Sequence, residues 1–69
     1  MNRIIMIGSM TNAQRARRAL LTKGISAHLT KNETDDRQGG CAYGIELGEH
    51  ELLSAISILR AIGLEYRVL

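Results

Sequence analysis

A single cysteine is the one side chain of this 69-residue chain that is well suited to covalent chemistry at neutral pH. Cys41 directly follows Gly39 and Gly40, which leave room for a bulky partner to approach. A thiol becomes a useful nucleophile where its surroundings favour the thiolate. Because the chain has no second cysteine and no convincing base, Cys41 is better equipped to hold a covalently bound group than to turn over a substrate. The sequence therefore favours a carrier or binding module over an enzyme.

The remaining polar groups predict neither a cofactor nor a metal. There is no Cys-x-x-Cys pair, no Cys/His cluster at zinc spacing and no glycine-rich phosphate loop. Asp35 and Asp36 form a carboxylate pair, but adjacent acids in a polar loop are usually solvated. His28 falls on the polar side of a predicted strand and His50 between two glutamates, and a solvated imidazole is the simpler interpretation of both.

The charges are divided unevenly along the chain. Six of the nine Lys and Arg residues precede Glu33 and no acid does, whereas all seven acids lie from Glu33 onward. We interpret this division as a basic half that faces an acidic half within the fold. Without Phe or Trp the chain lacks the stacking residues typical of RNA-binding proteins, so we expect no nucleic-acid partner.

Length and composition limit the class of protein. Sixty-nine residues make one domain, residues 1–69, and a core of this size supplies only about 3–5 kcal/mol. A lone cysteine excludes an internal disulfide, so a homodimer is the remaining means of stabilisation, and the small residues Ala42 and Gly44 would let two sheets pack closely. No apolar run spans a bilayer and no signal-peptide pattern is present. These absences, together with the free thiol, predict a cytoplasmic protein without a membrane partner.

The first half of the chain predicts a strand, a helix and a second strand. Residues 3–7 form a continuous β-branched run typical of a central strand. Ser9 and Thr11 are both good N-caps for the helix, which we expect to run to about Lys23 with Gly24 as its stop. The expected core positions of this helix and of the following strand are Ala13, Ala16, Leu20, Ala27 and Leu29.

The second half repeats the pattern. Residues 32–40 hold no hydrophobic side chain and predict a hairpin connection, after which a strand runs from Cys41 to Gly48. Glu49 and Glu51 open a second helix, where negative charge suits the helix dipole. The expected core positions of the last three elements are Tyr43, Ile45, Leu47, Leu52, Ala55, Ile56, Leu59, Ile62, Leu64, Tyr66 and Val68.

The order strand-helix-strand, repeated, predicts an α+β ferredoxin-like βαββαβ fold. Right-handed crossovers leave a gap between each outer pair of strands, and interleaving the two halves fills both gaps. We therefore expect a four-stranded antiparallel sheet in the order 4-1-3-2 with two helices on one face. The helices run antiparallel in this fold, which brings Arg17, Arg18 and Lys23 near Glu49 and Glu51.

This topology predicts a site at the start of the third strand, where the first strand ends. Alternation with Ile45 and Leu47 directs the sulfur of Cys41 toward the start of the first helix. A helix N-terminus favours anions and lowers a thiol pKa, and Lys31 and Arg37 flank the same loop. The predicted thiolate environment consists of Ser9, Met10, Thr11, Asn12, Gly39 and Gly40.

A family resemblance covers almost the whole chain. The segments 9–11 (Ser-Met-Thr), 23–25 (Lys-Gly-Ile), 40–45 (Gly-Cys-Ala-Tyr-Gly-Ile) and 63–66 (Gly-Leu-Glu-Tyr) resemble the small bacterial proteins of unknown function described as selenium/sulfur carrier-like. The resemblance implies that Cys41 is the carrier residue and that Ser9 is the matching serine turn. It also implies sulfur or selenium transfer beside a donating enzyme of the cysteine desulfurase type. Residues 31–38 match nothing in the family.

Two functions of other classes stay open at this point. One is a small ligand-binding or regulatory module that acts as a dimer through its open sheet face. The other is a structural interaction domain that docks a partner through Arg15 and Arg18. In either case Cys41 is an inert apolar residue, the usual role of a lone cysteine in a small domain.

Overall fold

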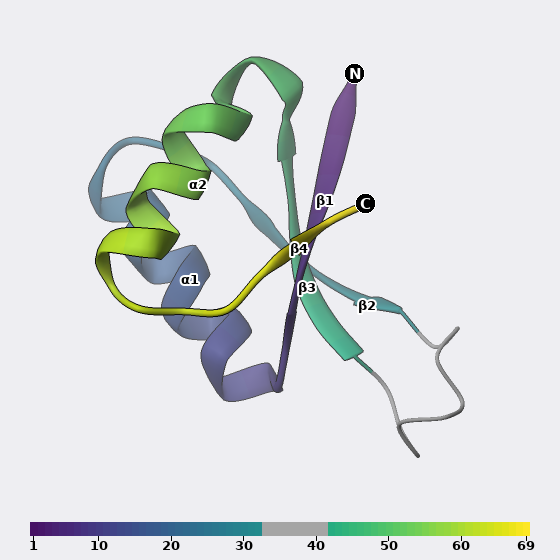
Figure 1. The fold of residues 1–69 in the computed structure, drawn as a ribbon. Helices are drawn as coiled ribbons and strands as arrows, with labels where there is room; N and C mark the ends of the chain where they lie inside the picture. Colours follow the sequence, from purple (N-terminus) through teal and green to yellow (C-terminus); the bar gives the residue numbers. More distant parts are fainter. Residues whose placement is uncertain (33–41) are drawn as a thin grey trace.

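A computed structural model describes residues 1–32 and 42–69, and Figure 1 shows how their elements are arranged. The elements in chain order are β1 (Asn2–Gly8), α1 (Met10–Thr22), β2 (His28–Asn32), β3 (Ala42–Gly48), the 3-10 helix η2 (Glu49–Glu51), α2 (Leu52–Ala61) and β4 (Arg67–Val68). Asn32, predicted to open the hairpin connection, is instead the last residue of β2 and pairs with Ala42. The rest of the predicted connection, and the predicted start of the third strand at Cys41, lie outside the described residues. The protein has the predicted α+β class.

The strands form one antiparallel sheet whose order from edge to edge is β2-β3-β1-β4. Counted from the β4 edge, this order reads 4-1-3-2. The two central strands, β1 and β3, place Ile5 opposite Ile45. Their register shifts between Met6 and Gly8, so that Gly8 lies opposite Tyr43. The end of β1 and the beginning of β3 are therefore neighbours in the sheet.

Both helices cover the same face of the sheet, and the core lies between these two layers (Figure 1). One fully buried large side chain comes from each of β1, α1, β3 and α2: Ile5, Leu20, Ile45 and Leu59. Burying a side chain of this size stabilises the fold by about 1.5–3 kcal/mol. The four residues therefore join both helices to the two central strands.

The boundaries of α1 follow from local sequence signals. Ser9 is the N-cap, since its hydroxyl oxygen accepts the N–H of Asn12 at 3.1 Å. Thr11, the other predicted N-cap, lies within the first turn instead. The helix ends at Thr22, and Gly24 follows with a φ of +82°, a conformation that glycine adopts without strain. The predicted buried stripe is confirmed at Ala13, Ala16 and Leu20.

The core-facing stripe of α2 is confirmed at Ala55 and Leu59 but wrong at its C-terminal end. Ile62 is 37% exposed, because the helix ends at Ala61 and the chain then turns at Gly63 with a φ of +77°. Leu64 enters the core after this turn and is only 8% exposed. Its N–H donates to the carbonyl of Leu59 at 3.1 Å, as in a glycine-terminated helix end.

Both edge strands begin later in the chain than the sequence predicts, and β4 is also shorter than predicted. Leu64 remains beside the end of α2, so β4 contains only Arg67–Val68. At the other edge, the N–H of Ile25 donates to Leu20 in α1 at 2.9 Å, and β2 starts only at His28. Leu29 on this edge is 38% exposed, although alternation predicts it to be buried. The helices do not fully cover the edge strands, and the alternation of polar and apolar residues in the sequence does not show this.

A glycine and a methionine share the centre of the sheet face opposite the helices. Met6 in β1 lies opposite Gly44 in β3 and is only 6% exposed. A Cβ atom added at Gly44 would lie 2.5 Å from the carbonyl oxygen of Ile5 and 3.0 Å from the Met6 sulfur. Gly44 therefore permits the close approach of the two central strands.

Replacing Gly44 by alanine is expected to destabilise the fold by about 1–3 kcal/mol, because the added methyl group meets backbone that cannot rotate away. The free energy of unfolding, measured by urea denaturation, checks this. Gly48→Ala is the matched control, since the nearest atoms there belong to the exposed imidazole of His50. Equal losses for the two variants would contradict the proposed contact.

Candidate functional site

The predicted thiolate environment begins at the turn between β1 and α1. Gly8 has a φ of +123°, and Ser9 is extended with φ −77° and ψ 155°. The carbonyl of Ser9 accepts the N–H of Ala13 at 2.9 Å, and its hydroxyl accepts the N–H of Asn12 at 3.1 Å. This turn sets the direction of α1, so that the first N–H groups of the helix point away from its N-terminus toward the end of the sheet where β1 ends.

Of the three helix residues in the predicted thiolate environment, one has a backbone N–H that is already hydrogen-bonded. The N–H of Asn12 is bound by Ser9, which leaves those of Met10 and Thr11 without an acceptor among residues 1–32 and 42–69. Met10 and Thr11 are both exposed. Because the N-terminus of a helix carries a partial positive charge, this turn is a small surface that favours an anion and is open to solvent.

The start of β3 lies beside this turn, as predicted. Tyr43, its second residue, is opposite Gly8. On the other side of β3, Tyr43 pairs with Lys31, an exposed residue of β2. Four residues singled out at this end of the sheet lie outside the described part of the chain: Arg37, Gly39, Gly40 and Cys41.

Among the described residues, the basic residues of α1 do not form the ion pairs with the acidic half of the chain that the sequence predicts. Arg3, rather than a residue of α1, forms an ion pair with Glu49 at 3.6 Å. Arg17 and Arg18 are exposed on α1, and no ion pair between described residues includes either of them. The basic first helix is therefore not explained by contacts with the acidic half of the chain that the structure describes.

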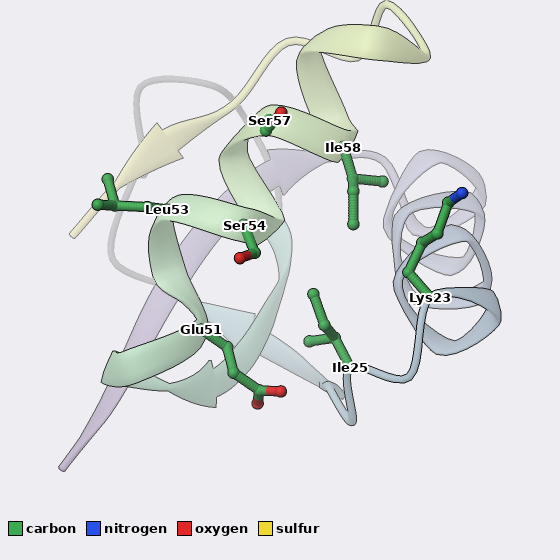
Figure 2. A pocket seen from close by; sticks show the side chains of 7 residues that line it. All are labelled: Lys23, Ile25, Glu51, Leu53, Ser54, Ser57 and Ile58. Carbon is green, nitrogen blue, oxygen red and sulfur yellow. The ribbon is translucent and has the colours of Figure 1, made fainter.

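A shallow groove of about 510 Å³ lies between the end of α1 and one side of α2 (Figure 2). Ile25 and Ile58 point toward one another within it, and Lys23 and Glu51 lie on its two sides. Small-molecule sites enclose most of their ligand, whereas this groove is open to solvent. No sequence pattern indicates this groove, because it forms only where the segment after α1 packs beside α2.

The other candidate groups form no site within the described residues. His28 and His50 are exposed, as predicted, and His50 lies 4.0 Å from the carboxylate of Glu51. No cluster of three or more His, Cys, Asp or Glu residues able to hold a metal occurs in residues 1–32 and 42–69. In the same part of the chain, neither helix is long and apolar enough to cross a membrane. Asp35 and Asp36 lie outside the described residues.

Comparisons with known proteins do not assign the site. No protein-family model, curated protein or solved structure matches this chain. The resemblance of segments 9–11 and 40–45 to the selenium/sulfur carrier-like family stays a prediction. The features that bear on function are the geometry at the start of α1 and the sequence around Cys41.

Replacing Ser9 by alanine is expected to lower the free energy of unfolding by about 0.5–2 kcal/mol, because the N–H of Asn12 loses its acceptor. Denaturation followed by circular dichroism measures the loss. Thr11→Ala is the matched control and is expected to change stability little. A larger loss for Thr11→Ala than for Ser9→Ala would mean that the N-cap is misassigned.

Proposed function

We propose that this protein is a sulfur or selenium carrier of ferredoxin-like fold, which holds the transferred atom on Cys41. The strand order and the placement of both helices on one face support the fold assignment. The similarity of segments 9–11 and 40–45 to the selenium/sulfur carrier-like family supports the role. A donating enzyme that carries a persulfide is the proposed partner.

One observation carries this proposal, the pairing of Gly8 with Tyr43. Cys41 precedes Tyr43 by two residues in the sequence, so the pairing favours a thiol near the first turn of α1. The N–H groups of Met10 and Thr11 at that turn favour negative charge, and a helix N-terminus lowers the pKa of a nearby thiol. A thiol in such a place would be a thiolate at neutral pH and able to accept an atom.

The transfer needs no oxidant or reductant. The Cys41 thiolate attacks the outer sulfur of a donor persulfide, R–S–SH. The S–S bond of the donor breaks, its electron pair leaves on the donor thiolate R–S⁻, and a new S–S bond gives Cys41–S–SH. A donor R–S–SeH transfers selenium in the same way. An acceptor thiolate then repeats the attack on the outer atom and regenerates the Cys41 thiolate.

Intact-mass spectrometry tests the carrier role directly. After incubation with a persulfide donor, the wild-type protein is expected to gain the mass of one sulfur atom, which dithiothreitol removes. Cys41→Ser is expected to gain none, because its hydroxyl is not ionised at neutral pH. A wild-type protein that gains no mass, or an equal gain in Cys41→Ser, would end the proposal.

The thiol pKa tests the role of α1 separately. We expect the pKa of Cys41 to lie below the usual value of about 8.5, as measured by the pH dependence of alkylation. Met10→Pro removes one N–H at the first position of the helix, where proline is well tolerated, and is expected to raise the pKa. Met10→Ala keeps the N–H and is the control. An ordinary pKa in the wild type would remove the electrostatic argument.

A further inference from the structure

We infer that the exposed face of α1 is a docking surface for an acidic protein. We call this surface the basic face and define it as Arg15, Arg17, Arg18 and Leu21. All four residues are exposed. The inference does not depend on the proposed carrier role, because the basic face lies on the outer side of the helix and includes no part of the thiol site.

The arginines of the basic face form no ion pair that would stabilise the described part of the fold. The helix carries three arginines and no acid along its 13 residues. Arg15 and Arg18 are three positions apart and lie on the same side of the helix, where like charges repel. No described ion pair relieves this repulsion, since the carboxylate of Glu49 is paired with Arg3. Carboxylates from outside the chain would relieve it.

The basic face also contains an apolar side chain that the core does not use. Leu20 is fully buried, whereas its neighbour Leu21 is 61% exposed. Leu21 is four positions after Arg17 and three after Arg18, so the three side chains are neighbours on the helix surface. Arginine is enriched in protein–protein interfaces, where lysine is depleted.

These features favour a protein over a nucleic acid as the partner. Binding of single strands needs exposed aromatic rings for base stacking, but Tyr43 is half-buried and Tyr66 packs against the core. A guanidinium group binds a carboxylate through two parallel hydrogen bonds. The surface therefore fits a partner segment that presents carboxylates about one helical turn apart for Arg15 and Arg18, with an apolar side chain a further turn along to contact Leu21.

Binding of a defined probe tests this inference. The probe is a synthetic helical peptide with glutamates four residues apart and leucines beside them, labelled for fluorescence anisotropy. Replacing both Arg15 and Arg18 by glutamine is expected to weaken binding by about tenfold at low salt. The matched control replaces Arg60 and Arg67, two exposed arginines outside α1, by glutamine and is expected to bind nearly as well as the wild type.

Further arms separate the alternatives. Cys41→Ser is expected to bind the peptide unchanged, which distinguishes this surface from the carrier site. Leu21→Ser is expected to weaken binding while circular dichroism shows an unchanged fold. The inference is overturned if the wild type does not bind the peptide or if both double variants weaken binding equally. Tighter binding to a single-stranded DNA oligonucleotide or to phosphatidylserine vesicles than to the peptide overturns it as well.

Discussion

The antiparallel pairing of β1 with β3 is the interaction on which the rest of this structure depends. Each edge strand pairs with one of these two strands, and both helices pack on the face that contains Ile5 and Ile45. A shift of one residue in the pairing would turn the core side chains of a strand to the opposite face. On the opposite face of the sheet, Gly44 lets β1 and β3 approach closely next to Met6, and this contact favours the same register.

The same pairing determines where the candidate site lies. The register shift after Met6 places Gly8 opposite Tyr43, so the chain leaves β1 for α1 beside the point where β3 begins. Ser9 then caps the helix by accepting the N–H of Asn12. The N–H groups of the two residues between them, Met10 and Thr11, are therefore the ones that can bind an anion at this turn. The candidate site is thus a consequence of sheet register and helix capping together.

Patterns of hydrophobic residues were enough to predict the element order and most of the core, because each period identifies one buried face. They failed where the chain leaves a regular element. The helix pattern continues through Ile62, but the turn at Gly63 directs Leu64 into the core instead. Ser9 and Thr11 are equivalent as N-caps by composition, and only the bond to Asn12 distinguishes them. The groove could not be predicted, since packing between distant segments forms it.

The two helices contribute to the fold in different ways, which bears on why the first is so basic. Residues of α2 supply volume to the core along most of its length, and partly buried Ile56 and Ile58 add to its buried stripe. The buried face of α1 instead contains the small residues Ala13 and Ala16, with Leu20 as its one large buried side chain. Such a narrow apolar stripe leaves most of the circumference of α1 outside the core. The outer face can therefore hold several arginines at little cost to packing, and these are the side chains that the inferred docking surface would use.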